Sequence, residues 1–141
     1  MENRKKAQDL IKAYKKEDYS FGIGVMDSLG KYIAQFGQET LLAISQNDWA
    51  KTLRSDVHKK LKEYGIKIID EISSARPNSP IEDVLSAAEA ISKAKPSSLT
   101  CVGGGSAIDA LKSANRVATF AQPLESFYGV GNVEKASLRY G

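Results

Sequence analysis

Three consecutive glycines, Gly103, Gly104 and Gly105, form the stretch of this 141-residue sequence that points most directly to a chemistry. Glycine has no Cβ, so a ligand can approach the main chain of such a turn closely. Ser106 follows and Asp109 lies three residues further on, which predicts a helix capped by Ser106 with Asp109 as its capping-box acid. The start of a helix binds phosphate through its free amides and dipole. The stretch therefore predicts a cradle for a phosphate or nucleotide, with an ordinary strand-to-helix turn as the alternative.

The elements around this turn predict an α/β fold. Residues 98–102 are apolar and β-prone, and the segment after the glycines has the spacing of a helix. Two further short apolar strands are expected at 40–44 and 66–69, and each is followed by a helix, at about 48–64 and 80–93. Repeated units of this kind favour parallel pairing in a Rossmann-like, doubly wound sheet with flanking helices.

Such a sheet would gather separate loops at one edge. Ligands of doubly wound folds lie beyond the carboxyl ends of the strands. Ser45 follows the first expected strand, and Asn78 lies in the loop after the second. We therefore expect Ser45 and Asn78 to lie beside the glycine turn. Serine and asparagine also favour turns for local reasons, so each of the two, taken alone, could serve the backbone only.

Helix boundaries and buried faces follow from capping signals and apolar spacing. Residues 2–16 are typical of an amphipathic helix, expected to be peripheral and docked by a narrow face. Ser79, Pro80 and Glu82 predict a helix start with Ser79 as its cap, and Gly65 is expected to end the preceding helix. The residues expected to face inward are Ala7, Leu10, Ile11, Tyr14, Leu29, Tyr32, Ile33, Phe36, Trp49, Leu53, Val57, Leu61, Ile81, Val84, Leu85, Ala88, Ile91, Leu111, Ala114, Val117 and Phe120.

Composition indicates one globular domain of average character. The net charge is +3, and much of the excess lies in the first sixteen residues, which favours a solvated helix face over nucleic-acid binding. Cys101 is expected to be a core thiol and His58 a solvated surface residue, and a single histidine provides no metal site. No apolar run reaches membrane-spanning length and the N-terminus is not that of a signal peptide, so we expect a cytoplasmic protein.

Several motifs occur in the order and spacing of a known family. Phe21-Gly-Ile-Gly24 comes first, then Arg76-Pro-Asn78, then Gly103-Gly-Gly-Ser-Ala-Ile-Asp-Ala110 with Lys112. Over residues 19 to 120 the chain thereby resembles the iron-containing alcohol dehydrogenases, whose superfamily includes glycerol dehydrogenases and dehydroquinate synthases. The resemblance implies an NAD(P)-binding α/β domain over residues 19–141, preceded by a peripheral helix over residues 1–18. It also implies the family's reaction, which interconverts an alcohol and an aldehyde or ketone.

The resemblance further assigns residues to the cofactor. It implies that Gly104 to Ser106 hold the pyrophosphate of NAD or NADP, that Asn78 lies near the cofactor, and that Asp109 faces the nicotinamide side. Ser45 stands where many members carry an acid for the adenine ribose. An acid repels a 2′-phosphate and a serine does not, so both NADP and NAD remain candidates.

The sequence ends before two segments with which members of this family continue. These are a threonine-rich stretch and a helical domain that supplies an aspartate and histidines to iron or another divalent metal such as zinc. The resemblance implies that the metal belongs to that missing domain and that this polypeptide alone has little or no activity, because hydride transfer would lack a Lewis acid. The partners expected are a dinucleotide and either a second copy or a separate metal-binding domain. One alternative is a free-standing nucleotide-binding or interaction protein without catalysis. The other alternative is a domain of the glycerol dehydrogenase or dehydroquinate synthase branch.

Overall fold

The computed structural model describes residues 2–16, 19–120 and 123–128. Its elements are, in chain order, α1 (Glu2–Lys15), η1 (Val25–Ser28), α2 (Leu29–Ala34), β1 (Glu39–Ile44), η2 (Asp48–Ala50), α3 (Lys51–Glu63), β2 (Lys67–Ser73), α4 (Ile81–Ala94), β3 (Ser98–Val102), α5 (Gly105–Thr119) and η3 (Leu124–Phe127), where η marks a 3₁₀ turn. Within these residues no helix is both long and apolar enough to cross a membrane. The alternation of strands and helices confirms the predicted α/β class.

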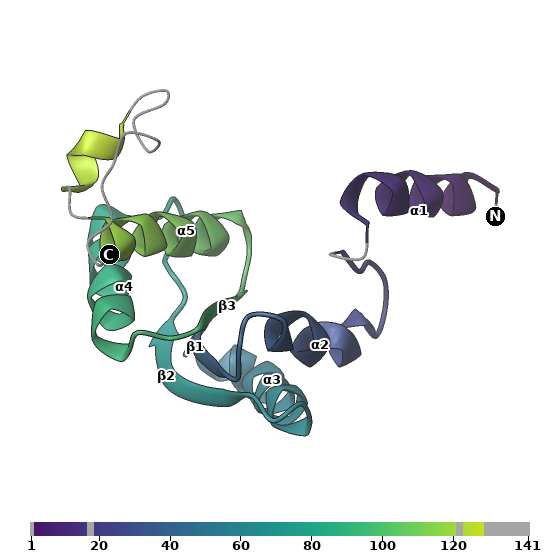
Figure 1. The fold of residues 1–141 in the computed structure, drawn as a ribbon, viewed down its shortest axis with the longest axis horizontal. Helices are drawn as coiled ribbons and strands as arrows, with labels where there is room; N and C mark the ends of the chain where they lie inside the picture. The colour runs from purple at the N-terminus through teal and green to yellow at the C-terminus, as the bar shows by residue number, and fades with distance from the viewer. Residues whose placement is uncertain (1, 17–18, 121–122, 129–141) are drawn as a thin grey trace.

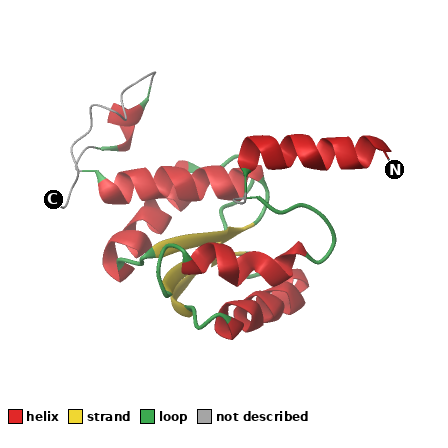
Figure 2. Cartoon of the chain, turned by 45° about the vertical axis from the view of Figure 1, so that its right-hand side comes forward, coloured by secondary structure: helices red, strands yellow, loops and turns green. Residues whose placement is uncertain are grey.

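The three strands form one parallel sheet in the order β2-β1-β3, which lies left of the centre in Figure 1. The connection through α3 leads from β1 outward to β2, and the connection through α4 returns past β1 to β3. Right-handed crossovers that run in opposite directions place their helices on opposite faces of a sheet. Figure 2 accordingly shows the strands between two layers of helices, which is the doubly wound arrangement expected from the sequence.

β1 is the centre of both hydrophobic cores. Leu41 and Ala43 belong to the core formed with α4 and α5, whereas Leu42 and Ile44 belong to the core formed with α2 and α3. All four side chains are buried, since successive residues of a strand point to opposite faces and both faces are covered. The uninterrupted apolar run of β1 predicted this environment.

A pair of buried hydroxyl groups joins β1 to β3. The Oγ1 atoms of Thr40 and Thr100 lie 2.8 Å apart. The Thr40 hydroxyl also donates to the carbonyl oxygen of Ser98, at 3.2 Å, which is its register partner on β3. In the described part of the chain, no buried side-chain nitrogen or oxygen lacks a hydrogen-bond partner.

Several residues expected to face inward are exposed. Trp49 is 73% exposed because residues 48–50 form a 3₁₀ turn, in which Ala50 occupies the buried position instead. Phe36 is 70% exposed because α2 has already ended before it. Ile81 and Leu85 are also exposed. Ile81 is the first residue of α4, and Leu85 lies beside the row of buried residues on this helix. The predicted stop at Gly65 is confirmed by its left-handed φ of 69°.

α1 stands apart from the sheet, at the right of Figure 1, and none of its residues is buried. Leu10 is 64% and Tyr14 82% exposed. Ile11 is half-buried and lines a surface hollow with Tyr19 and Phe21. The expected docking by an apolar face is therefore limited to Ile11. Charged side chains dominate this helix, so little apolar area is available for burial.

Replacement of a β1 core residue tests the double burial of this strand. We expect Leu42→Ala to lower the free energy of unfolding by about 2 to 5 kcal/mol, because it leaves a cavity between β1 and α3. Urea unfolding followed by circular dichroism measures this loss. The exposed control Leu10→Ala should change stability by no more than about 0.5 kcal/mol. Equal effects of the two substitutions would contradict the core assignment.

Candidate functional site

A cleft of about 520 Å³ opens beyond the carboxyl ends of the three strands. Ser45 follows β1, Ser73 ends β2, and Gly103 follows β3, and all three residues line the cleft. The chain leaves β1 toward β2 on one side and later returns to β3 on the other, so the strand order reverses here. Doubly wound sheets bind their ligands at such a reversal.

The structure brings some of the predicted site residues together and leaves others outside. Ser45 and Gly103 to Ser106 line the cleft. Asn78 does not line it, although its backbone N–H donates to Ser106 Oγ at 3.1 Å. Asp109 is exposed on α5 and also lies outside the cleft lining. Of the predicted site residues, the glycine turn, Ser106 and Ser45 thus line the cleft, whereas Asn78 and Asp109 do not.

The three glycines serve two different purposes. A Cβ added to Gly103 would lie 2.7 Å from the Cβ of Ala107, which is closer than real Cβ atoms approach, so only glycine fits against the first turn of α5. A Cβ added to Gly104 or Gly105 would meet nothing within 4 Å. Gly103 is therefore required by packing, whereas Gly104 and Gly105 leave the main chain open to the cleft.

The start of α5 provides free amide donors at this opening. The first bond of the helix runs from Ile108 N–H to the carbonyl oxygen of Gly104, at 3.1 Å. The amides of Gly105, Ser106 and Ala107 precede that bond, and none of them donates to another segment among the described residues. Together with the helix dipole they make a seat for an anion.

The predicted capping box of this helix is wrong. Gly104 is the N-cap of α5, and no side chain caps it. The Ser106 hydroxyl oxygen instead accepts the Asn78 amide, and the Ser106 carbonyl oxygen accepts the Ser79 hydroxyl at 2.6 Å. Ser106 is not the cap because α5 begins one residue before it, and its bonds tie the loop after β2 to the glycine turn instead.

The Ser79 cap predicted for α4 is also wrong, because α4 begins at Ile81, one residue later than expected. The Ser79 hydroxyl is engaged with Ser106, and Pro80 takes the cap position before Ile81 without a side-chain bond. Asn78 and Ser79 have φ values of 65° and 50°, in the left-handed region that non-glycine residues seldom adopt. The tertiary bonds to Ser106 hold the loop in that conformation.

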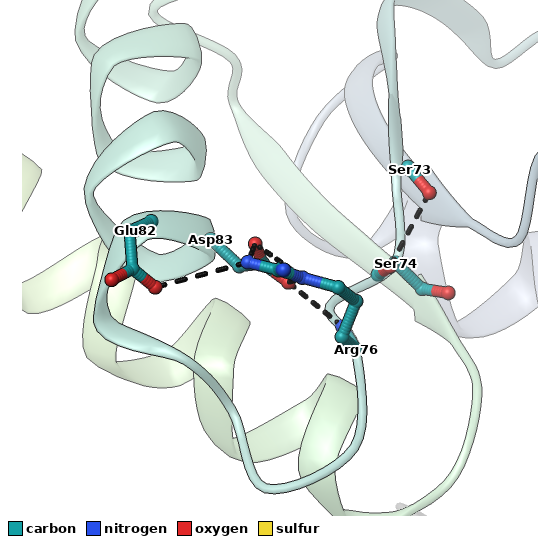
Figure 3. A network of polar contacts seen from close by, with 5 residues as sticks. All are labelled: Ser73, Ser74, Arg76, Glu82 and Asp83. Atoms are coloured by element: carbon teal, nitrogen blue, oxygen red, sulfur yellow. Dashed lines mark hydrogen bonds and ion pairs between the residues drawn. The ribbon is translucent and has the colours of Figure 1, made fainter.

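An arginine fixes the same loop to α4 (Figure 3). Arg76 Nη2 lies 2.7 Å from Asp83 Oδ1 and 3.7 Å from Glu82 Oε2, and the Arg76 amide donates to Asp83 Oδ2 at 2.8 Å. The hydrogen bonds that Arg76 donates to Asp83 lower the pKa of the Asp83 carboxyl and raise the pKa of the Arg76 guanidinium. Arg76 also lines the cleft, so this pair holds one of its walls. Sequence reasoning overlooked Asp83, because it considered only the acid at Glu82.

The segment after β1 is held by a second arginine. Arg54 Nη1, on α3, donates to the carbonyl oxygens of Ser45, at 2.7 Å, and Asn47, at 3.2 Å. The Ser45 hydroxyl oxygen accepts the Asn47 amide at 3.3 Å. Arg54 therefore attaches the backbone of residues 45–47, which form the second wall of the cleft, to α3.

A polar cluster joins the residue after Ser45 to β2 and α3. Gln46 Nε2 donates to Glu71 Oε1 at 2.9 Å, and His58 Nε2 contacts the other carboxylate oxygen. Burial alone would raise the pKa of Glu71, but its bonds with Gln46 and His58 outweigh that effect and hold the pKa below its usual 4.5. His58 is half-exposed yet paired with β2, so the expectation of a simply solvated residue needs this correction.

The other reactive groups in the described part of the chain do not form a second site. Cys101 is half-buried, packs against the core of α4 and α5, and has its thiol pKa raised by burial, which agrees with a core thiol. Across residues 2–16, 19–120 and 123–128, no three His, Cys, Asp or Glu side chains lie close enough together to hold a metal ion.

Comparisons with known proteins show which proteins this chain resembles in sequence and in fold. The sequence model of the iron-containing alcohol dehydrogenase family matches residues 16–139. The choline dehydrogenase of Bacillus subtilis strain 168 is 30% identical over 99 residues, which make up 70% of this chain and 24% of that protein. The crystal structure of NADH-dependent butanol dehydrogenase A from Thermotoga maritima is similar with a TM-score of 0.70 and 29% identity, over 82% of this chain and 30% of that one. An archaeal halo-thermophilic alcohol dehydrogenase from a Red Sea brine pool shares the fold, with a TM-score of 0.61 and 23% identity over 67% of this chain. The chain thus spans 24% to 30% of the length of these relatives.

Two glycine substitutions test whether Gly103 is required by packing while Gly104 faces open space. We expect Gly103→Ala to lower the free energy of unfolding by about 1 to 3 kcal/mol, because its methyl group collides with Ala107. Gly104→Ala places its methyl group in open space at an ordinary backbone conformation, so it should lower the free energy of unfolding by less than about 1 kcal/mol. Urea midpoints of the two variants measure the difference. A Gly104→Ala variant at least as destabilised as Gly103→Ala would contradict the geometry of the turn.

The Arg76–Asp83 pair should make stability depend on acid pH. The folded pKa of Asp83 lies below its ordinary value of 3.8, so the contribution of the pair is complete above that value and is lost as the pH falls through the folded pKa. We expect Asp83→Asn to be less stable than the wild type at neutral pH, by a margin that shrinks in acid. Thermal unfolding measured across pH checks this margin. Asp56→Asn, which removes an exposed carboxylate on α3, is the control and should show no such convergence.

Proposed function

Because this chain belongs to the iron-containing alcohol dehydrogenase family, we propose that its cleft is the NAD(P) seat of an enzyme that interconverts an alcohol and an aldehyde or ketone. One observation carries this proposal. The glycine turn leaves the first amides of α5 free, at a place where a Cβ on Gly104 or Gly105 would meet open space. Residues 19–141 would then form the cofactor-binding domain, with residues 1–18 as an appended helix.

The diphosphate of the cofactor fits the start of α5. Three successive amides, from Gly105 to Ala107, precede the first helical bond and have no acceptor among the described residues. The positive end of a helix dipole adds about 0.3 to 1 kcal/mol for an anion at an exposed site. The Ser106 hydroxyl oxygen accepts the Asn78 amide, so its hydroxyl proton and its amide both remain able to donate to the diphosphate. Most donors of the cradle are nevertheless backbone amides, which accounts for the need for glycine.

The lining of the cleft suits either nicotinamide cofactor. Ser45 follows β1, where an acid would select the free ribose of NAD. The Ser45 oxygen accepts the Asn47 amide, and its hydroxyl proton remains able to donate. None of the described residues that line the cleft is an Asp or Glu. A 2′-phosphate would therefore meet no negative charge there, and we propose that NADPH binds as well as NADH.

The metal of the family does not fit this part of the protein. The family name implies iron, yet the described residues contain no group of three potential ligands. We therefore assign no chemical step to these residues. Their proposed share of the reaction is to bind the cofactor and orient it, and we propose that this chain alone does not turn over an alcohol.

One observation favours a second candidate, an interaction protein that has kept the fold. Among the residues that the structure describes, β3 pairs with β1 on one edge only. The backbone groups of its other edge could pair with a strand from a second chain. Sedimentation of a dimer that binds no nucleotide would favour this candidate over the dehydrogenase.

Calorimetric titration with NADH and with NADPH tests the proposal. We expect saturable binding of at least one of them with Kd below about 1 mM, equivalent to about −4.1 kcal/mol. Gly104→Ala should weaken binding at least about tenfold, since its methyl group occupies the cradle, whereas Ser55→Ala on the exposed side of α3 should not. Binding of neither nucleotide by folded protein at concentrations well above 1 mM would overturn the proposal.

A further inference from the structure

We propose that Trp49 is the platform on which the adenine ring of the cofactor stacks. This inference rests on the proposed function and deepens it, because it assigns the base-binding end of the cleft to one side chain. Trp49 lines the same cleft as the glycine turn and is 73% exposed. A large aromatic residue that lies open in a concave site with convergent polar groups is typical of ligand recognition.

The exposure of Trp49 is fixed by the local fold. The η2 turn directs the neighbouring Ala50 into the protein, where it is fully buried, and the Ala50 amide donates to the Asn47 carbonyl oxygen at 3.0 Å. Arg54 holds the carbonyl oxygens of Ser45 and Asn47 from behind. These contacts anchor the backbone on both sides of the indole, so the ring is presented to the cleft before a ligand arrives.

The position of Trp49 identifies the part of the ligand that it would meet. The anion seat lies at the β3 side of the cleft, at the start of α5, whereas Trp49 and Ser45 lie on the β1 side. The acid that binds the adenine ribose in doubly wound folds follows a strand, as Ser45 follows β1 here. Trp49 comes four residues later, so a nucleotide whose diphosphate occupies the seat would bring its base, past the ribose, to the indole.

The chemistry of the indole suits an adenine. A base stacks on an aromatic face whatever its hydrogen-bonding pattern, and the described lining on this side offers no acid to read the base edge. The serine at position 45 also makes weaker ribose contacts than a carboxylate would. Stacking on Trp49 would therefore supply affinity that Ser45 does not.

The chain offers a direct probe, since Trp49 is its only tryptophan. We would titrate the full chain with ADP, nicotinamide mononucleotide and inorganic pyrophosphate, and follow tryptophan fluorescence excited where adenine does not absorb. ADP should quench the emission saturably. Nicotinamide mononucleotide and pyrophosphate should leave it nearly unchanged, because neither carries an adenine.

Substitution tests the same contact without fluorescence. We expect calorimetry to show that Trp49→Ala weakens ADP binding about 5- to 150-fold, the range found for one base on one aromatic ring, and leaves pyrophosphate binding unchanged. Trp49→Phe should retain most of the affinity because it keeps an aromatic face. Phe36→Ala is the matched control, since Phe36 is 70% exposed and does not line the cleft.

The outcomes separate this inference from the proposed function. If the folded wild type binds none of ADP, NADH, NADPH and pyrophosphate, the cofactor cleft itself is refuted and the platform with it. If NADH or NADPH binds but Trp49→Ala has the affinity of Phe36→Ala, only the platform is overturned. Quenching by nicotinamide mononucleotide without quenching by ADP would likewise overturn it, because the other end of the cofactor would then lie on the indole.

Discussion

The burial of β1 on both faces is the constraint on which the rest of this structure depends. Its side chains alternate between a core with α2 and α3 and a core with α4 and α5, and Leu41, Leu42 and Ile44 are completely inaccessible to solvent. A strand covered in this way must have a neighbour on each side for its backbone groups, and β2 and β3 provide them. Because both neighbours run parallel to β1, all three carboxyl ends meet at one edge. The cleft is a consequence of that convergence.

The sequence was informative where a local rule and the tertiary fold agree. The apolar runs of β1 and β3 could be predicted because strand burial depends on residue type, and so could the stop at Gly65, because glycine favours a positive φ. The glycine turn could be predicted because the close approach of Ala107 to Gly103 requires a residue without a Cβ. The same reasoning failed at the helix caps. Ser79 and Ser106 have the right residue type and spacing for caps, but they bond to each other across 27 positions of the chain. No local rule contains that contact, and tertiary pairing overrides the local preference.

Trp49 shows a second way in which a periodic pattern can mislead. Its spacing to Leu53, Val57 and Leu61 is that of an inward stripe on an α-helix. The first turn is 3₁₀, however, and the difference in pitch gives the buried position to Ala50. The sequence pattern thus starts the buried stripe at Trp49, one residue too early. The buried stripe starts at Ala50, and Trp49 lines the cleft instead. The departure from the rule coincides with the part of the molecule where we infer function.

The Thr40–Thr100 contact has a consequence for the accuracy of the cleft. A shift of β3 along β1 by even one residue would break the contact between two buried hydroxyls, and a buried hydroxyl left without a partner costs about 1 to 3 kcal/mol. The contact therefore acts as a register lock between the two strands. Ser45 and the glycine turn follow these strands directly, so the lock also sets their relative height at the sheet edge. A hydrogen bond deep in the interior thereby determines how far apart the two walls of a solvent-facing site can stand.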